Sequence, residues 1–531
     1  MTENAENTQV FDRTTLEDDA VAQLGYQQEL KRSFGLLGMV GFSFSIVTSW
    51  TALGGTLIIG AESGGPPVMI WSWIGICLFT LAVAYSMAEM CSAYPLAGGQ
   101  YSWVAVLAPP KVARGLSWIT GWFMVTGVLA MGATNNFVAA NFILGQANLA
   151  NPGYTIERWH TVLVAYCIVA ICIVTNIWGR QILDKLSTGI LFWNITSFVI
   201  VIVVVLACND NKQSPSFVFK DMQNFTGFGT AFAALIGILQ SAFGMCCYDA
   251  PSHMIEEMRD GRKQAPRAII LSVVIGCFTG FVFLIAICFC IKDLASTGET
   301  STGVPLIQIF YDSTGSKVGT CFLTSMISVI ALVASNSLLA EGSRALYAFA
   351  RDNGLPFSSF FSRVDSKKKV PIFALLLAAL VQVALDAIYF GTVTGFETVI
   401  SISTEGFYLS YAMPILVRIL NHLTGTHQNI GGSWQLGRWG LPLNIVAFLF
   451  LIFCSITFNF PTENPVTKDN MNYTSAAIGV IGVISLITWI TTGRKHFSGP
   501  LTHTRAEEVV GMHGTPPVES DAAAEKQGLA N

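Results

Sequence analysis

Lysine and arginine residues alternate along this chain in the way expected of a protein that crosses a lipid bilayer many times. Twelve apolar segments of membrane-spanning length divide the 531 residues, and the stretches between them are alternately rich and poor in basic residues. If the N-terminus lies in the cytosol, 23 of the 29 lysines and arginines fall on the cytoplasmic side, counting Arg418 at the cytoplasmic end of the tenth segment. Basic residues favour cytoplasmic loops, and a cation at the bilayer centre costs about 2.5–3.5 kcal/mol. We therefore predict an all-α integral membrane protein with 12 transmembrane helices and both termini in the cytosol.

The predicted spans each have about 18–29 residues, enough to cross a hydrocarbon core of about 30 Å at 1.5 Å per residue. They are residues 36–59, 68–90, 116–144, 161–178, 186–207, 230–258, 268–291, 318–341, 372–390, 396–419, 441–460 and 474–492. Together they predict one membrane domain, residues 34–493, between a polar cytoplasmic tail, residues 1–33, and a second, residues 494–531, that we expect to be disordered. The first tail has no apolar stretch, so we expect the first span to direct membrane insertion.

The composition points away from metal centres, cofactors and nucleic acid. Most of the 12 cysteines lie within the apolar spans, where cysteine behaves as a small hydrophobic residue, and neither Cys-x-x-Cys pairs nor histidine clusters occur. Hydrophobic residues make up 52% of the chain and charged residues 12%, so we expect the function to lie within or across the membrane. The basic cluster of residues 367–369 is expected to contact anionic lipid. We therefore expect no cofactor, no bound metal and no nucleic acid partner.

Two of the spans, the first and the sixth, are interrupted near their centres. Hydroxyl-bearing residues and glycines gather between Ser43 and Gly55, and residues 243–251 include Gly244, Asp249 and Pro251. Interrupted spans five apart indicate a 5+5 inverted repeat with broken helices 1 and 6, followed by two extra helices. Irregular backbone at that depth must line a cavity or be covered by protein. The alternative is that the glycines only allow close helix packing and the serines bond back to their own helix.

Two stretches of the sequence resemble signatures of the amino acid–polyamine–organocation (APC) superfamily. Residues 94–101 (YPLAGGQY) resemble its Pro-x-x-Gly-Gly-x-Tyr signature, and residues 343–356 (SRALYAFARDNGLP) resemble its second signature. The chain is more closely similar to the fungal amino acid/choline transporter family, which includes GABA and choline permeases. This similarity is carried by residues 24–32, 248–257 and 408–414, and it runs from about residue 20 to residue 495. The resemblance implies two broken helices, a central substrate site, alternating access and coupling to protons.

The two interruptions supply the residues that we expect to bind a substrate. The positive end of the outer half of the first helix, near Gly54 and Gly55, would hold a carboxylate. Exposed carbonyls of the inner half, near Thr48 and Ser49, would hold an ammonium group, whereas choline would need aromatic faces. The predicted substrate-binding residues are Thr48, Ser49, Trp50, Thr51, Gly54, Gly55, Phe243, Gly244, Tyr248 and Asp249. For the aromatic members of this set, plain packing is the alternative.

Asp249 precedes Pro251 by two residues, which is the usual place of a helix N-cap. Its carboxylate could therefore cap the inner half-helix, or it could attract a substrate amine or a transported proton. His253 lies one helical turn further on, and there we expect a hydrogen-bonded structural histidine.

Glu405 lies near the middle of the tenth span, with no lysine or arginine close to it in the sequence. An ionisable group at that depth is a candidate for function, so Glu405 is our proton-coupling candidate, or a counter-charge for a cationic substrate. The alternative is a neutral, hydrogen-bonded glutamate that bridges to another helix. Four further charged residues, at the cytoplasmic ends of spans two and eight, are expected to form inner-gate or structural ion pairs: Glu89, Glu341, Arg344 and Arg351.

These features favour a secondary active transporter of a small amine-bearing or zwitterionic solute, such as an amino acid, GABA or choline, coupled to protons. A nucleotide-driven pump is disfavoured because the chain lacks a Gly-x-x-x-x-Gly-Lys-Ser/Thr loop, and an enzyme because no catalytic constellation lies at either interface. A transporter-fold nutrient sensor, and a carrier of a secondary metabolite or polyamine, remain alternatives. We expect the plasma membrane, with the vacuolar membrane as the alternative.

Overall fold

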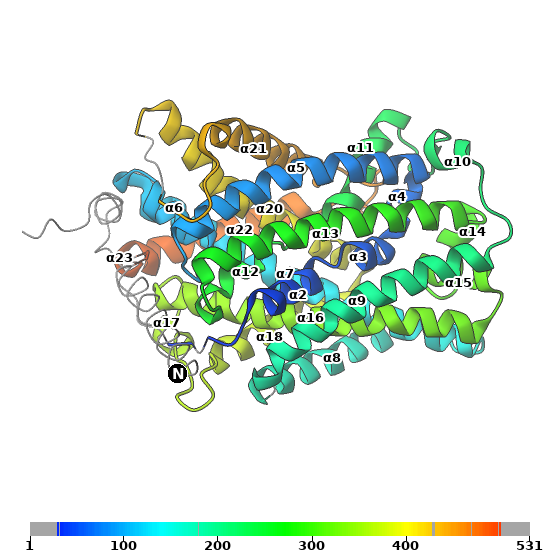
Figure 1. The fold of residues 1–531 in the computed structure, drawn as a ribbon, viewed down its shortest axis with the longest axis horizontal. Coiled ribbons are helices and arrows are strands. Elements are labelled where there is room, and N and C mark those ends of the chain that lie inside the picture. The colour runs from blue at the N-terminus through cyan, green and yellow to red at the C-terminus, as the bar shows by residue number, and fades with distance from the viewer. Residues whose placement is uncertain are drawn as a thin grey trace, which may run out of the picture.

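The computed structural model describes residues 29–500, apart from residues 31, 179, 427–430, 469 and 498 and the side chains of residues 180–184 and 295. Long helices run side by side along one direction (Figure 1). They are α2 (Leu36–Val47), α3 (Ser49–Gly55), α5 (Gly65–Ala93), α7 (Pro110–Ala150), α8 (Arg158–Trp178), α9 (Arg180–Cys208), α11 (Thr230–Phe243), α13 (Gly261–Cys290), α16 (Lys317–Arg351), α18 (Ile372–Asp386), α20 (Val393–Leu423), α21 (Gly440–Thr457) and α22 (Thr474–Thr488).

The predicted all-α membrane fold is confirmed. Ten helical segments in the described part of the chain are long and apolar enough to cross a membrane, α2 and α3 counting together as the first. The two other predicted spans are α20 and an interrupted segment in which α11 is followed by the short helices α12 (Ala250–His253) and η1 (Ile255–Glu257). Each of the twelve apolar segments therefore corresponds to one helix or to consecutive helices. The inverted repeat stays a prediction.

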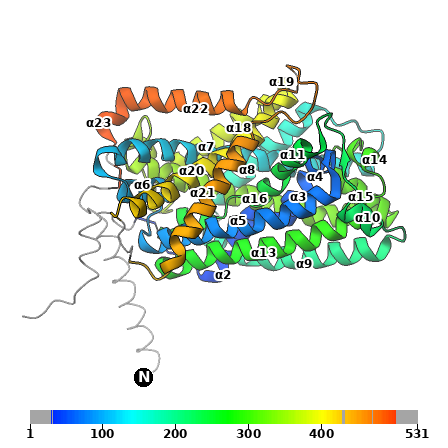
Figure 2. The ribbon, with the colours of Figure 1, turned by 90° about the horizontal axis from the view of Figure 1, so that it is seen from above.

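Short helices mark the two ends of the bundle. At one end lie α6 (Gln100–Leu107), α12, α17 (Ser358–Phe361) and α23 (Arg494–His496), and at the other lie α4 (Leu57–Glu62), α10 (Pro215–Phe219), α14 (Leu294–Gly298) and α15 (Pro305–Thr314) (Figure 1). We call these the α17 end and the α14 end. The short helix α19 (Ile388–Gly391) is labelled in Figure 2, and η2 (Gly437–Trp439) directly precedes α21. At the α14 end, β1 (Ser63–Gly64) pairs antiparallel with β2 (Gln223–Asn224). The described parts of the predicted cytoplasmic stretches that contain α6, α17, η2 and α23 lie at the α17 end.

The helices differ in how much of their surface the protein covers. The first span is the most enclosed, with 83% of its apolar window buried, and α7 packs between α16 and α20. By contrast α22, which continues as the π-helical turn η3 (Trp489–Gly493), lies along one edge of the bundle, and only 11% of its window is buried (Figure 2). An apolar helix that is exposed on nearly every side needs lipid around it, so α22 belongs to the periphery and the first span to the functional core.

Glycine allows two central helices to touch through their backbones. A Cβ atom added to Gly127 on α7 would lie 2.8 Å from the backbone nitrogen of Phe407 and 3.0 Å from the carbonyl carbon of Gly406, both on α20. Small residues at such crossings let membrane helices approach closely enough for van der Waals packing to hold them together.

We expect the change Gly127→Val to destabilise the bundle, because the new side chain would meet backbone that cannot move aside. Overpacking of this kind typically costs about 1–3 kcal/mol. The thermal midpoint of the detergent-solubilised protein should fall, whereas Gly189→Val on α9, where an added Cβ meets nothing within 4 Å, should leave it unchanged. Equal midpoints for the two variants would contradict the close contact of α7 with α20.

Candidate functional site

Two spans are interrupted, as the sequence predicts, but the interruptions differ in size. The first is a single residue, Thr48, with φ 29° and ψ 39°, between α2 and α3. The second covers residues 244–249 between α11 and α12 and includes Cys247 with φ 61°. A positive φ is unusual for residues that carry a Cβ, above all for a β-branched threonine, and such backbone clusters at ligand sites.

The position of the first interruption corrects one expectation from the sequence. The outer half-helix α3 begins at Ser49, so its free first-turn amides belong to Ser49 and Trp50. Gly54 and Gly55 are its last residues and serve packing, because an added Cβ would lie 2.5 Å from a methyl group of Leu306 and 2.9 Å from one of Val138 respectively. The prediction of a positive helix end near Gly54 and Gly55 is therefore wrong.

A small cavity lies between the two interruptions. Its volume is about 30 Å³, far below the roughly 300–1,000 Å³ of a pocket that holds a drug-sized ligand, so the site is closed in this structure. The residues around it come from the two interrupted spans and also from α7 and α16. They are Ile46, Val47, Thr48, Thr51, Ala52, Met131, Asn135, Val138, Phe142, Phe243, Cys246, Cys247, Ala331 and Leu338.

The cavity brings together three of the ten predicted substrate residues: Thr48, Thr51 and Phe243. Trp50 lies elsewhere, because its indole donates a 2.6 Å hydrogen bond to Asn194 and its ring packs against Phe198 and Phe283. The remaining predicted residues, Ser49, Gly54, Gly55, Gly244, Tyr248 and Asp249, are not part of the cavity wall either. Gly244 packs close to Leu53 and Trp73, and the Tyr248 ring centroid lies 5.2 Å from that of Tyr411.

Sequence reasoning missed Asn135, the most polar residue of the cavity wall. Its Nδ2 donates to the carbonyl of Ala331 at 3.0 Å and to the Ser335 hydroxyl at 2.8 Å, both on α16. Because both donors are used, the amide orientation is fixed, and the side-chain oxygen remains as an acceptor at the cavity. An amide in the middle of an apolar span was the signal that could have revealed it.

Asp249 occupies the N-cap position of α12, but its carboxylate accepts no capping hydrogen bond from a backbone amide of that helix. Instead it accepts hydrogen bonds from Nε2 of Gln100, at 2.6 Å, and from the Tyr411 hydroxyl, and it lies 3.1 Å from Nε2 of His253. These partners come from α6, α20 and α12. The predicted cap by the carboxylate is therefore wrong, and this fully buried group instead ties the interrupted segment to its neighbours.

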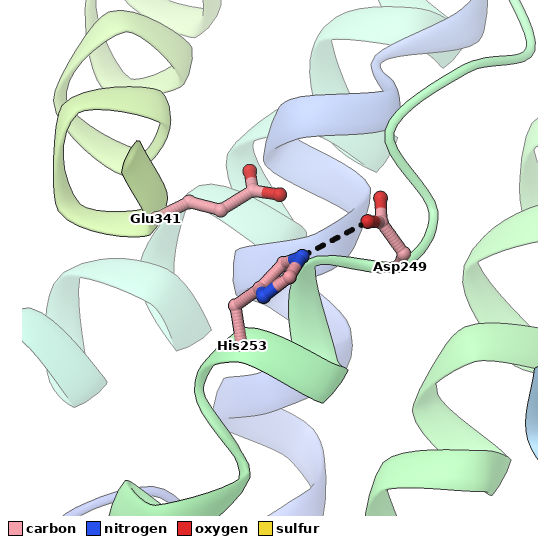
Figure 3. A group of neighbouring side chains, drawn as sticks. All are labelled: Asp249, His253 and Glu341. Atoms are coloured by element: carbon pink, nitrogen blue, oxygen red, sulfur yellow. Dashed lines mark hydrogen bonds and ion pairs between the residues drawn. The ribbon is translucent and has the colours of Figure 1, made fainter. Parts of the chain in front are cut away.

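Glu341 on α16 points toward Asp249 and His253 (Figure 3). One ligand-type atom from each of the three side chains lies within 4.8 Å of the other two, and all three residues are buried. Neither Glu341 oxygen has a hydrogen-bond partner in the part of the chain that the structure describes. Three such groups could hold a cation, but both ring nitrogens of His253 already face acceptors, namely Asp249 and the carbonyl of Ala97.

The α17 end is closed by a layer of ion pairs, although not by the ones expected. Arg344 bonds to Glu257 at 2.7 Å, Arg351 to Glu256 at 3.1 Å and Arg418 to Glu89 at 3.1 Å. The prediction that Glu341 pairs with Arg344 or Arg351 is wrong. Glu257 and Glu256, in the turn after α12, bond to these two arginines instead. Glu89 does form an ion pair, with Arg418 from α20.

The segment that precedes α2 adds to this closure. The backbone amides of Ser33 and Phe34 both donate to the carbonyl of Glu257, at 2.9 and 3.0 Å, and Tyr347 donates a 2.7 Å hydrogen bond to Glu29. The chain that enters the first span is therefore bound to the turn that carries the Arg344 ion pair.

Glu405 lies away from the cavity wall. It is 5% exposed, and both of its carboxylate oxygens accept from Nδ2 of Asn459, at 3.1 and 3.2 Å. Asn459, which follows α21, also accepts from the Ser475 hydroxyl at the start of α22. This arrangement matches the bridging alternative, since Glu405 connects α20 with the two peripheral helices. Its role in proton coupling stays a prediction.

Glutamates gather at the α14 end. Burial, and secondarily the negative charges of Glu463 and Glu397, raise the pKa of Glu62. A carboxyl group is protonated more readily where other carboxylates are close. Three carboxyl groups therefore lie close enough together at this end to influence one another.

We expect the buried pair of Arg344 and Glu257 to control the stability of the closed state. The single change Arg344→Met leaves a buried carboxylate unpaired, which typically costs about 3–5 kcal/mol, whereas Arg344→Met combined with Glu257→Met removes both charges and should recover much of that loss. Thermal midpoints in detergent provide the measurement.

The exposed pair of Lys263 and Asp260, at 3.8 Å, supplies the control, because the midpoint should hardly change in Lys263→Met. A double variant at residues 344 and 257 that is no more stable than the single one would contradict a paired, buried interaction.

Comparison with known proteins shows similarity to amino acid permeases and related transporters along nearly the whole chain. A family model described as amino acid permease matches residues 34–484. A Macrophomina phaseolina protein named as an amino acid/polyamine transporter is 64% identical over 440 residues, which cover 83% of this chain and 97% of the relative. An amino-acid permease of Arabidopsis thaliana is 30% identical, with coverages of 91% and 95%, and the choline transporter of Saccharomyces cerevisiae is 31% identical, with coverages of 90% and 84%.

Proposed function

The chain belongs to the amino acid permease family, and we propose that it carries a small zwitterionic amine across the membrane together with a proton. Membership confirms the resemblance that the two signature stretches indicate, and it makes the protein a permease of the APC superfamily. The observation that carries the proposal is the cavity, which is enclosed by the two interrupted spans together with α7 and α16. Alternating access then means opening this closed cavity first at one end of the bundle and then at the other.

The cavity wall supports a zwitterion over a pure cation. The backbone amides of Ser49 and Trp50 directly follow the cavity-lining Thr48, although neither side chain lines the cavity, and as free first-turn donors they are suited to a carboxylate. The fixed oxygen of Asn135 and the last carbonyls of α2 are acceptors for an ammonium group. No carboxylate side chain lines the described cavity, so a polyamine would lack counter-charges. Its wall holds two aromatic rings, Phe142 and Phe243, fewer than a cage around a quaternary ammonium such as choline would use.

Sidedness follows from the distribution of charge. The α17 end carries the basic stretches of the sequence, so we place it in the cytosol, and the acidic α14 end then faces outward. With this orientation the ion-pair layer forms the inner gate. We propose the plasma membrane as the location, where uptake of amines from outside would use the inward proton gradient.

A competition panel tests the substrate class. In proteoliposomes that take up a labelled neutral amino acid, we expect unlabelled zwitterions, including GABA, to compete, whereas choline and spermidine at equal concentration should compete at least tenfold more weakly. The physical reason is that a cation lacks the carboxylate that would bind the amides of α3. Stronger competition by choline than by any zwitterion would contradict the proposed class.

The acceptor role of Asn135 can be tested separately. In Asn135→Ala the substrate ammonium loses one buried hydrogen bond, so the KM for transport should rise about tenfold, equivalent to roughly 1–2 kcal/mol. The matched control is Gln146→Ala on the same helix, whose side chain bonds to Ser328 and Ser325 away from the cavity. An unchanged KM for Asn135→Ala would remove this residue from the binding site.

A further inference from the structure

The contact of His253 with Asp249 requires a proton between them. Nδ1 of His253 lies 3.0 Å from the backbone carbonyl of Ala97, which can only accept, so Nδ1 must carry a hydrogen. Nε2 lies 3.1 Å from a carboxylate oxygen of Asp249. A neutral imidazole would place a bare lone pair against that oxygen. The contact is a hydrogen bond only when the pair carries a second proton, as imidazolium with carboxylate or as imidazole with carboxylic acid.

Glu341 adds a second proton site beside this pair. It is fully buried, and neither of its oxygens has a donor in the described chain. An unpaired carboxylate so close to Asp249 would be strongly disfavoured, so in the closed structure Glu341 holds a proton of its own. The nearest charged groups at the α17 end, Glu256 and Glu257, are paired with arginines and do not neutralise it.

The titratable side chains around these three residues come from two elements. The interrupted segment contributes Cys246, Cys247 and Tyr248, and α20 contributes Tyr411. From α6 comes Gln100, which is not titratable. None of these groups is a cation. Within the part of the chain that the structure describes, a proton is therefore the positive charge that can neutralise the carboxyls of Asp249 and Glu341.

The location of this proton site joins it to the cavity. Asp249 follows Cys247 by two residues in the interrupted segment, and Glu341 follows Leu338 by one helical turn on α16, while Cys247 and Leu338 both line the cavity. Asp249 and Glu341 therefore stand on the two elements that must separate if the cavity opens toward the α17 end. That separation would let water reach Glu341.

We propose that Asp249, His253 and Glu341 form the binding site of the coupling proton. This inference rests on the proposed function and deepens it. With the cavity closed, the site holds one proton between Nε2 of His253 and Asp249, in addition to the hydrogen on Nδ1, and one proton on Glu341. When the α17 end opens, the O–H bond of Glu341 breaks, its proton passes to cytosolic water, and the carboxylate remains until the site is protonated again from the other side.

The test uses the full-length protein in proteoliposomes with the membrane potential held at zero. A gradient of one pH unit with one proton per substrate sustains about tenfold accumulation. We expect about tenfold accumulation for the unchanged protein and for the control Asp386→Asn, a buried carboxyl on α18. Glu341→Gln should accumulate no substrate above equilibrium, although it still exchanges labelled for unlabelled substrate, because glutamine imitates the protonated state permanently.

A second measurement does not depend on that variant being well folded. Substrate added to the unchanged protein in weakly buffered detergent should release or bind protons, read with a pH-sensitive dye. His253→Gln should reduce this signal at least threefold, whereas the control Asp386→Asn should leave it unchanged.

Several outcomes would overturn the proposal. The first is full accumulation by Glu341→Gln, and the second is loss of accumulation in Glu405→Gln but not in Glu341→Gln. The third is a metal site in place of a proton site: micromolar Zn²⁺ would inhibit exchange by the unchanged protein but not by Glu341→Gln, and the Glu341→Gln change would have no effect on accumulation. Absence of both exchange and uptake in the unchanged protein, tested with zwitterions and cations, would instead contradict the proposed function itself.

Discussion

Hydrogen bonding to the Asp249 carboxylate holds the interrupted segment in a bilayer that offers its backbone no partners. Six residues without regular helix are tolerated at membrane depth only where protein surrounds them, because lipid cannot bond to their backbone groups. Gln100, Tyr411 and His253 bring α6, α20 and α12 to the same carboxylate. The three contacts therefore fix the segment relative to the rest of the bundle. The cavity wall at Cys246 and Cys247 depends on this arrangement.

The sequence predicted the features that depend on composition and spacing. The twelve spans, their alternation between two ends and the interruption at residues 244–249 all follow from rules that need no knowledge of tertiary contacts. The interruption of the first span lies at Thr48, within the predicted stretch of residues 43–55, and only the positive helix end expected near Gly54 and Gly55 was wrong. Glycine pairs such as Gly54–Gly55 indicate close packing as readily as a helix break, whereas the observed break is a threonine with a positive φ, for which the sequence carries no signal.

Partner choice among charged residues was not predictable, because it depends on which elements meet. Glu341 is three residues from Arg344 in the sequence, yet the arginine side chain reaches Glu257, which the turn after α12 brings to it. The same geometry leaves Glu341 facing Asp249 rather than a cation. Asn459 was missed for the same reason, since its role depends on Glu405 on another helix, whereas the amide of Asn135 in the middle of an apolar span was a signal in the sequence itself.

Two buried carboxyls in this protein show how the surroundings decide what a membrane-embedded acid can do. Glu405 has a fixed amide donor, Asn459, so its charge state can change without leaving it unpartnered, and it joins α20 to helices outside the core. Glu341 has no such donor and stands against another acid, between two elements that border the cavity. A displacement of Glu405 would move only the peripheral helices to which it is bonded. A displacement of Glu341 would change its distance from Asp249 and therefore the number of protons that the two acids bind. Depth in the membrane is the same kind of evidence for both residues, and only their contacts separate a bridging role from a coupling role.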